Sequence, residues 1–488
     1  MRAARFALAA IAVACALLFA RPHSTPGPAM RDFEAYYAAG RTWSHGGNPY
    51  GVAIWKAERR IPGVDPHRYE VLPFVGPPAT LPLWGLLARL PFASAVAVWG
   101  AVLGASLAVV ILVTLRLLEM RVTPLAFGTL LLAALAFGPV TSGIALGQVV
   151  LPAFASALLA LAWLERNALA AGVATVFAAL QPNVALVLLA RLRRLRSWPV
   201  FAAAFLAFEL LAAAAGGGFR SLWAYQRLLA AQGAAEAGST IQTTPYAIAS
   251  GFGASHEVAT FVALAAGVAA VFAWAALVVR KERGAGAIAI TCALLPFVVP
   301  FFHEQDLTVA YFAAIFAVAR ADARRWPIAA AGALLVAVDW LGLAQRPDGV
   351  LQTFLLAVGA LLAYAALHRG VRPAALAAPL GVLVLLALAG TYAQAHPAPI
   401  WPDAMRALPP IAPGTPLASI WHAEQRATGL FAPNAFWALL RCGPLLGCGL
   451  LAYCCSTASS QPQISTSIML SNGVTWFGWK FRRSRLKT

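Results

Sequence analysis

Charged residues are scarce in this sequence: they make up 11% of its 488 residues, whereas 61% are hydrophobic and the mean hydropathy is +0.74. Soluble domains carry about 25% charged residues, so an ordinary soluble enzyme is excluded. Apolar stretches recur almost to residue 393, each ended by a short polar or basic turn. Because about 20 apolar residues cross a bilayer as a helix, and because the period-2 alternation of a barrel is missing, we predict an all-α multi-pass membrane protein.

Other familiar patterns are missing as well. The sequence has no glycine motif for nucleotides, no zinc-protease motif, no nucleophile elbow and no soluble nucleotide-sugar domain. No internal repeat is evident, so nothing points to the inverted repeats of many transporters. The six cysteines fit no zinc spacing well. We therefore expect neither a metal nor a cofactor.

We predict about eleven to twelve spans, and the twelfth depends on an ambiguous segment at 168–190, which Gln181-Pro182-Asn183 interrupts. The first stretch could instead be a signal peptide, but no clear small-residue cleavage site follows it, so a retained span is favoured. The predicted spans are 6–20, 93–118, 124–140, 146–164, 197–216, 256–279, 284–302, 305–320, 326–344, 350–367 and 373–393.

The net charge of +18 could suggest a nucleic-acid partner, but the basic residues gather in alternate short loops, which is the positive-inside pattern of membrane proteins. We therefore expect no nucleic acid and place the basic loops in the cytoplasm. The alternation holds only if segment 168–190 enters and leaves on the same side, and Pro182 supplies the break. The basic loops hold Arg116 and Arg121, Arg166, Arg191–Arg196, Arg280–Arg283, Arg320–Arg325, and Arg369 with Arg372.

This topology divides the chain into a membrane domain, residues 1–393, and an extracytoplasmic or irregular tail, residues 394–488. The long loop 21–92, the turn before Gln148, loop 217–255 and the turn at His303 would face outward. The tail becomes atypical from about residue 440, since no acidic residue follows Glu424 and serine and threonine increase. We assign no function to residues 440–488 and expect their removal to be tolerated.

The strongest local signal is a polar motif just after the first span. On a helix, Asp32 and Tyr36 share one face, while Glu34 points away and should matter less. Such an acid near the bilayer is a candidate general base, although the motif could equally be a helix cap with tyrosines at the interface. The motif reads Asp32-Phe33-Glu34-Ala35-Tyr36-Tyr37, followed by Gly47-Asn48-Pro49-Tyr50.

Two further polar clusters interrupt apolar sequence. His303-Glu304-Gln305-Asp306 contains more ionisable groups than a short turn requires, although a solvated turn is the simpler alternative. Gln148, after Gly147, could contact a ligand, but such a residue more often makes a hydrogen bond between helices.

Together these motifs, in this order, resemble glycosyltransferase family 87, of the GT-C class of membrane glycosyltransferases, over about residues 6–393. The resemblance implies an enzyme that transfers mannose, or a related hexose, from a polyprenyl-phosphate donor to an extracytoplasmic acceptor. It also implies that Asp32 matches the catalytic base and His303 a histidine near the donor phosphate. In one departure, Gln181 stands where the family often has lysine before its proline, which weakens a phosphate-binding role for that segment.

The residues agree with this chemistry. A lipid-phosphate donor needs no nucleotide fold, the acceptor hydroxyl needs a carboxylate base, and the phosphate needs a cation. The outer-face cations available for this are Arg31, Arg41, Arg59, Arg60, Arg68 and His303. A single displacement would invert the anomeric centre. We expect Tyr36, Tyr37, Asn48, Tyr50, Gln148 and Glu304 to contact substrate. The expected partners are membrane lipid, the lipid-linked donor and a glycolipid or polysaccharide acceptor, at a bacterial plasma membrane. The alternatives are a transporter or flippase, or a polymerase or ligase, of lipid-linked saccharides.

Overall fold

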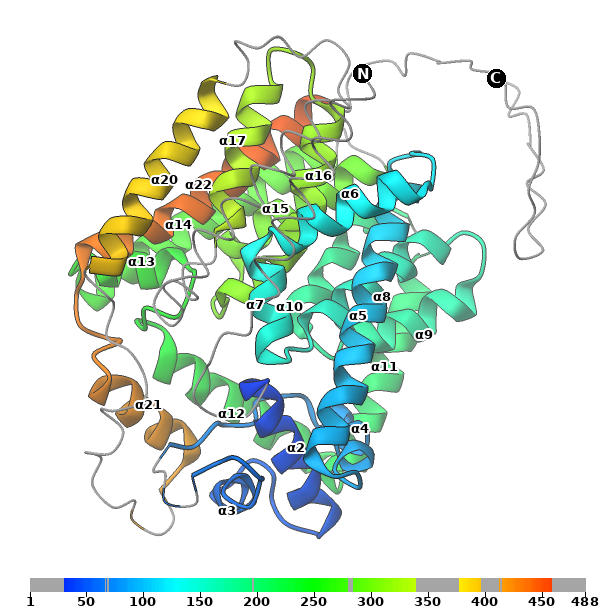
Figure 1. The fold of residues 1–488 in the computed structure, drawn as a ribbon. Helices are drawn as coiled ribbons and strands as arrows, with labels where there is room; N and C mark the ends of the chain where they lie inside the picture. The colour runs from blue at the N-terminus through cyan, green and yellow to red at the C-terminus, as the bar shows by residue number, and fades with distance from the viewer. Residues whose placement is uncertain are drawn as a thin grey trace.

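The structure is a computed structural model that describes residues 30–65, 67, 70–194, 197–279, 284–338, 377–395, 412 and 415–458. Within these ranges the secondary structure is helical, with one isolated β-bridge between Gln242 and His303 and no strand (Figure 1). The predicted all-α membrane fold is confirmed. Two candidate spans, 6–20 and 350–367, lie outside the described residues, as does Arg68.

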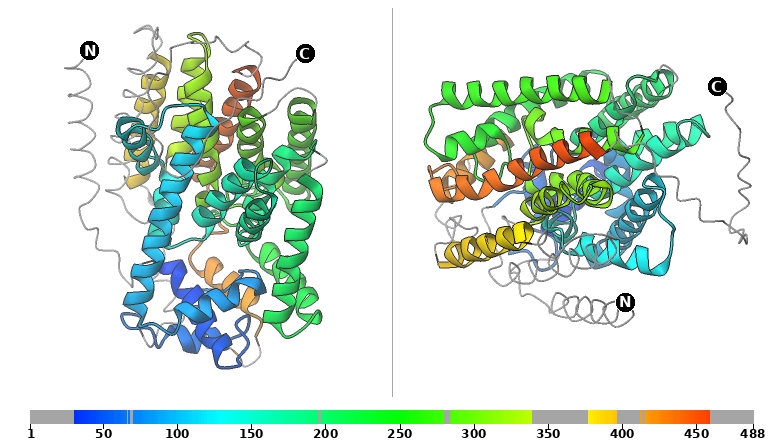
Figure 2. Two further views of the ribbon diagram at one scale, coloured as in Figure 1. Left: turned by 90° about the vertical axis from the view of Figure 1, so that its right-hand side faces the viewer. Right: turned by 90° about the horizontal axis from the view of Figure 1, so that it is seen from above.

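The helices form a bundle with a second layer packed at one end (Figures 1 and 2). The end layer contains α2 (Arg31–Ser44), α3 (Ala53–Glu58), η1 (Pro78–Thr80), α4 (Leu81–Leu87), α12 (Arg220–Glu236) and α21 (Leu417–Ala427). The bundle contains α5 (Phe92–Leu117), α6 (Pro124–Leu135), α7 (Gly138–Leu146), α8 (Val150–Trp163), α9 (Ala168–Ala178), α10 (Pro182–Ala185), η2 (Leu186–Arg191), α11 (Ser197–Gly216), α13 (Pro245–Gly251), α14 (His256–Trp274), η3 (Ala275–Val279), α15 (Ala285–Val298), η4 (Glu304–Val309), α16 (Ala310–Arg320), α17 (Trp326–Ala337), α20 (Ala377–Ala395) and α22 (Ala435–Ala458).

Among the described residues, four helices are long and apolar enough to cross a membrane: Phe92–Leu117, Ser197–Gly216, His256–Val279 and Ala435–Thr457. Three of them match predicted spans. The predicted span 124–140 is instead the pair α6 and α7, bent by 74°, because Gly138-Pro139 ends one helix and begins the next. The predicted spans 146–164, 284–302 and 305–320 form shorter helices of 14, 14 and 11 residues.

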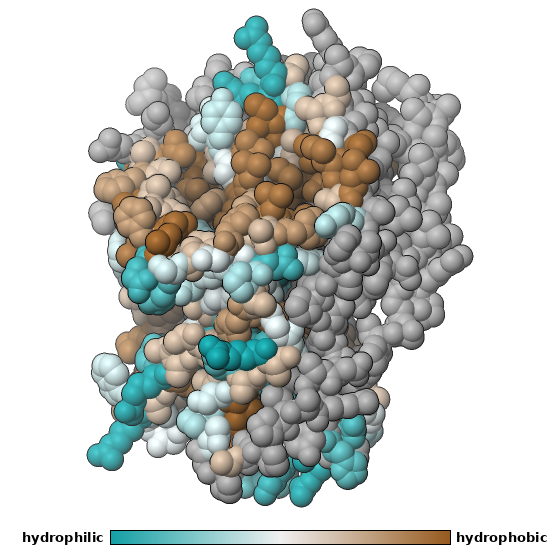
Figure 3. Space-filling view, turned by 90° about the vertical axis from the view of Figure 1, so that its left-hand side faces the viewer, coloured by the Kyte–Doolittle hydropathy of each residue, from teal (hydrophilic) through white to brown (hydrophobic). Residues whose placement is uncertain are grey.

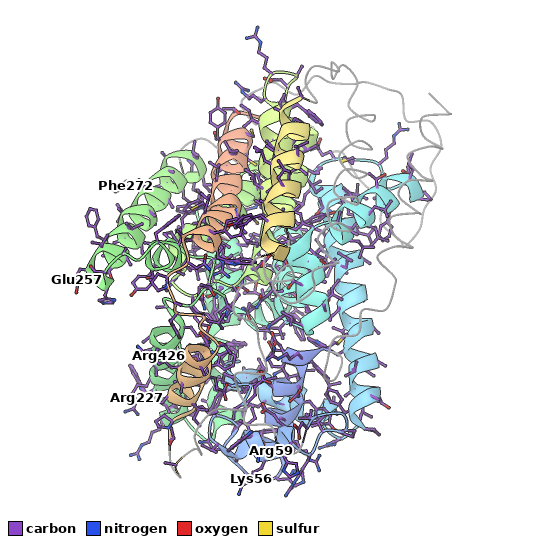
Figure 4. The ribbon with its side chains drawn as sticks, turned by 60° about the vertical axis from the view of Figure 1, so that its left-hand side comes forward. Lys56, Arg59, Arg227, Glu257, Phe272 and Arg426 are labelled. Atoms are coloured by element: carbon purple, nitrogen blue, oxygen red, sulfur yellow. The ribbon has the colours of Figure 1, made fainter. Side chains whose placement is uncertain are left out.

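Apolar side chains gather on the bundle rather than on the end layer (Figure 3). Along α14, large hydrophobic residues stand exposed, including Phe261 at 71% and Phe272 at 72%. On the end layer, Lys56, Arg59, Arg227 and Arg426 lie on the outer surface (Figure 4). An exposed apolar belt beside a polar layer is the pattern of a bundle in lipid with a domain in water.

The ambiguous segment 168–190 has the break and the neighbouring ends that re-entry requires. It is broken between α9 and α10, where Pro182 begins the second helix. Glu165, before the segment, forms an ion pair with Arg194, after it, so both ends lie on the same side. A second contact joins two other basic loops, since Arg320 donates to the carbonyl of Leu118 at 2.8 Å. Each of these two contacts joins loops that the topology assigns to the same side.

The expectation of an irregular segment beyond residue 440 is wrong for α22. This helix is one of the four long apolar helices, half of its apolar window is buried, and it packs against α15, α16 and α17. Gly332 and Gly447 face each other at the crossing with α17, where a Cβ on Gly447 would lie 2.7 Å from the Gly332 carbonyl oxygen. Small residues allow such close contact of membrane helices. The shift in composition therefore hid a helix of the core, whose removal should damage the fold.

Candidate active site

A cavity of about 1230 Å³ lies between the end layer and the bundle. Its polar wall contains Asp32 and Tyr36 from α2, Gln148, Glu236 from α12, and His303. Its apolar wall runs along α14 and the end of α15, where the lining includes Ala263, Leu264, Gly267, Val268, Val271, Phe272, Phe297 and Val298. Several of the α14 residues are also exposed on the outer surface of the bundle, so the apolar part of the cavity borders the membrane face.

Asp32 belongs to a chain of three side chains. The Gln148 amide donates to the Asp32 carboxylate through Nε2, and Tyr36 donates from its hydroxyl to Gln148 Oε1 at 2.7 Å. The Tyr36 ring stacks on Trp84 of α4, with ring centroids 4.8 Å apart, which fixes the hydroxyl in place. As predicted, Asp32 and Tyr36 share one helix face, and Gln148 joins them across the cavity wall.

Gly147 explains why Gln148 can reach Asp32. Its φ of 75° ends α7 in the left-handed region, and a Cβ there would lie 2.8 Å from the Cβ atoms of Met30 and Phe33. Glycine is the residue that adopts this conformation without strain. Trp99 holds the same turn by donating to the Gly147 carbonyl at 2.7 Å. Gly147 therefore brings the end of α7 against α2 and directs Gln148 into the site.

His303 contributes the opposite wall. Its Nε2 lies 3.0 Å from Glu236 Oε2, and its backbone N–H donates to Asp306 Oδ2 at 3.0 Å. The broken segment packs on the same loop, because Gln181 donates to Asp306 Oδ1 at 3.2 Å and Asn183 donates to the Phe301 carbonyl at 2.7 Å. The side chain of Gln181 is thus engaged in holding the His303 loop.

Burial and neighbouring charges, respectively, raise the pKa of two groups in the site, Asp32 and His303. Burial raises the pKa of Asp32 above its ordinary value, although Arg31, the Gln148 hydrogen bond and His303 oppose this shift. Burial lowers the pKa of His303, but the hydrogen bond and charge of Glu236, aided by Asp306 and Asp32, outweigh it and leave the pKa raised. Asp32 can therefore accept a proton near neutral pH more readily than an exposed carboxylate.

Three of the predicted substrate-contact residues lie outside the cavity lining and make structural hydrogen bonds. Tyr37 is buried and donates to the Leu90 carbonyl at 2.8 Å, and Tyr50 donates to the Gly76 carbonyl at 2.9 Å. Asn48 is exposed and accepts a hydrogen bond from the Tyr50 backbone N–H at 3.0 Å, closing a turn. None of the three lines the cavity. Aromatic and turn residues near a membrane surface fit either role, and here they stabilise the end layer.

Glu304 and Glu34 also lie away from the cavity lining. Glu304 is 4% exposed and its charge acts on Arg441 of α22. Glu34 does point away from Asp32, but it is completely buried. Its position makes it part of the packing of α2, so it is unsuitable as a neutral comparison for Asp32.

Sequence reasoning missed two residues of the site, Glu236 and Trp421, and gave too little weight to a third, Arg31. Arg31 lines the cavity beside Asp32 and forms an ion pair with Glu70. Glu236 and Trp421 meet at the wall near His303, where the Trp421 indole N–H donates to Glu236 Oε1. Arg31 adjoins the predicted base and could have been weighted more heavily. Glu236 and Trp421 lie in segments of mixed polarity without a recognisable motif, so the sequence contains no signal that would single them out.

Comparison with known proteins supports the family. Residues 74–300 match the sequence model of glycosyltransferase family 87. No curated protein and no solved structure matches the chain. The match agrees with the predicted family through this region, and with the apolar helices it supports a membrane glycosyltransferase. Asp32 precedes the matched residues and His303 follows them, so their roles depend on the geometry of the cavity.

Proposed function

We propose that this family 87 glycosyltransferase transfers a hexose, with mannose as the first candidate, from a polyprenyl-phosphate donor to a glycolipid or polysaccharide acceptor. The observation that carries the proposal is a single cavity with two kinds of wall. One part presents a carboxylate and an imidazole, and the other is apolar and borders the membrane face along α14. A lipid-linked sugar matches these two parts, because it combines a polar sugar phosphate with an apolar isoprenoid chain.

The reaction assigns a task to each wall. The acceptor hydroxyl oxygen attacks the anomeric carbon, the bond from that carbon to the phosphate oxygen breaks, and the electron pair leaves with polyprenyl phosphate. Asp32 takes the proton of the hydroxyl, and Gln148 with Tyr36 orients the carboxylate. His303 and Arg31 are the cations of the cavity wall that would meet the phosphate. A single displacement of this kind inverts the anomeric centre.

The sidedness follows from the basic loops. The α5–α6 loop, which holds Arg121 and follows Arg116 in the last turn of α5, meets Arg320 at the end of the bundle away from the end layer (Figure 1). If these loops are cytoplasmic, the cavity and the end layer face the extracytoplasmic side. Cytoplasmic nucleotide sugars cannot reach that side, which favours a lipid-linked donor. The family match argues against the transporter and flippase alternative.

The donor class can be tested with purified protein in nanodiscs. Polyprenyl-phosphate mannose, polyprenyl-phosphate glucose and GDP-mannose are offered in turn with a membrane lipid extract as acceptor. We expect transfer from a polyprenyl-phosphate sugar and none from GDP-mannose alone. Equal turnover with GDP-mannose would overturn the proposal.

The apolar wall can be tested separately with two variants of α14. Ala263 lines the cavity, whereas Ala265, on the same helix, is exposed and does not. Ala263→Trp should raise KM for a long-chain polyprenyl donor and affect a short-chain analogue much less, because the indole fills the space for the chain. Ala265→Trp should leave both unchanged. An equal effect of the two tryptophans would show that the isoprenoid chain binds elsewhere.

A further inference from the structure

We propose that Glu236 is a positioning residue for His303: its carboxylate fixes the imidazole and keeps it cationic where the donor phosphate binds. The inference rests on the proposed function and adds a residue to the same site. Glu236 is the last residue of α12, is 3% exposed, and belongs to the cavity wall. A negative side chain at a helix C-terminus is electrostatically unfavourable, so helix stability does not account for an acid at this position.

Each carboxylate oxygen of Glu236 accepts two hydrogen bonds. Oε1 accepts from Gln232 Nε2 at 2.8 Å and from the indole N–H of Trp421. Oε2 accepts from Gln242 Nε2 at 2.8 Å and from His303 Nε2 at 3.0 Å. Four acceptor sites on two oxygens are those of an ionised carboxylate. Since the other three partners are neutral, His303 is the one that can balance this charge.

The contacts of Gln242 and Glu236 together assign the tautomer of the imidazole. Gln242 Oε1 accepts from the Phe302 N–H at 2.9 Å, so its Nε2 must be the donor to Glu236. Gln242 Nε2 also lies 3.2 Å from His303 Nε2. An ionised Glu236 Oε2 has no hydrogen to donate, so the imidazole Nε2 that lies 3.0 Å from it must carry the proton. The proton on His303 Nε2 is therefore fixed, and Nδ1 is the nitrogen whose protonation decides the charge of the ring.

The surrounding charges agree with a cationic ring. Glu236 from α12, Asp306 from η4 and Asp32 from α2 all favour the charged imidazole and raise the pKa of His303 against the effect of burial. Two cations lie on neighbouring elements. Arg31 is paired with Glu70, and Arg441 of α22 donates to the Gln242 carbonyl at 3.4 Å and interacts with Glu304.

The two acids that line the cavity thus have different tasks. Asp32 accepts from Gln148, whereas Glu236 is occupied by four donors. Protonation of Glu236 would sacrifice at least one of these bonds, and charge-assisted hydrogen bonds are the stronger ones. Asp32 is therefore the acid that can receive the acceptor proton, and Glu236 maintains the field in which the phosphate binds.

The test is the pH dependence of kcat/KM for the lipid-linked donor. Activity that needs cationic His303 is lost as pH rises through its pKa. In Glu236→Gln the raised pKa falls, so the alkaline limb should move to lower pH. At neutral pH, KM for the donor should rise on the order of tenfold or more, as expected for a lost charge-assisted contact. Glu257→Gln, on the exposed N-terminus of α14, is the matched control and should leave the limb unchanged (Figure 4).

A double-mutant cycle separates this role from a purely structural one. In a His303→Gln background, Glu236→Gln should have little further effect, because the group it acts on is gone. If Glu236→Gln does not fold, Glu236→Asp carries the test: it keeps the charge but withdraws it from Nε2, so the alkaline limb should move in the same direction by less.

Each outcome has one meaning. An unmoved alkaline limb, or additive losses in the cycle, would overturn the role of Glu236 while leaving the transferase intact. Failure of the wild-type protein to use any polyprenyl-phosphate sugar would instead overturn the proposed function.

Discussion

Replacing Gly147 with alanine should damage both the stability of the protein and its catalytic site. The φ of 75° places the residue in the left-handed region, where an L-residue costs about 1–2 kcal/mol. The new methyl group would also lie 2.8 Å from the Cβ atoms of Met30 and Phe33. These atoms are fixed to the backbone of α2, so the helices must separate, at about 1–3 kcal/mol for overpacking. The expected loss is therefore about 2–5 kcal/mol.

The chain offers a matched control for this variant. Gly46, in the turn after α2, has nearly the same φ of 73°, but a Cβ added there would meet no atom within 4 Å. Gly46→Ala should therefore cost only the conformational part, about 1–2 kcal/mol. The difference between the two variants isolates the contact between α7 and α2.

The assay measures thermal unfolding and turnover on the same detergent-purified protein. Gly147→Ala should unfold at a lower temperature than Gly46→Ala. It should also lose turnover at temperatures where it is still folded, because Gln148 no longer meets Asp32 and Tyr36. Equal destabilisation by the two alanines, or wild-type turnover in Gly147→Ala, would refute the account of this turn.

Two other predictions concern the C-terminal helix and the base. A chain ending at residue 434 lacks α22 and should yield little folded protein by size-exclusion chromatography. A chain ending at residue 458 keeps this helix and should retain both fold and activity. Equal recovery of the two chains would mean that α22 is dispensable. Because burial raises the pKa of Asp32, turnover should fall with decreasing pH already above the ordinary range of an aspartate. Gln148→Leu removes a hydrogen bond that lowers this pKa, so it should move the acidic limb of kcat/KM to still higher pH, and a shift to lower pH would contradict the assigned contact.

The sequence predicts those parts of the site that depend on local geometry. Helical spacing puts Asp32 and Tyr36 on one face. The alternation of basic loops predicts that segment 168–190 re-enters, and the ion pair between Glu165 and Arg194 agrees with this. Each of these inferences needs only neighbouring residues or a count of charges.

The remaining parts depend on contacts between distant segments. Glu236 becomes part of the site because α21 and the loop before α13 close around it, 67 residues before His303 in the chain. Tyr50 is of a residue type that is common in binding sites, yet its hydroxyl donates a hydrogen bond to the Gly76 carbonyl. The long apolar helix α22 was obscured by a local change in composition, although its hydropathy alone would have identified it.

The most direct test of the central claim is the turnover of Asp32→Asn with the lipid-linked donor. Asparagine keeps the size of the side chain and much of its hydrogen bonding with Gln148, but it cannot take a proton. Glu257→Gln, an exposed amide substitution away from the cavity, serves as the control. Removal of a general base costs about 10²–10⁴-fold in rate. We predict that Asp32→Asn inserts and binds donor, yet loses transfer by this factor while the control retains it; turnover above about a tenth of the wild-type rate would lie outside that range and contradict Asp32 as the base.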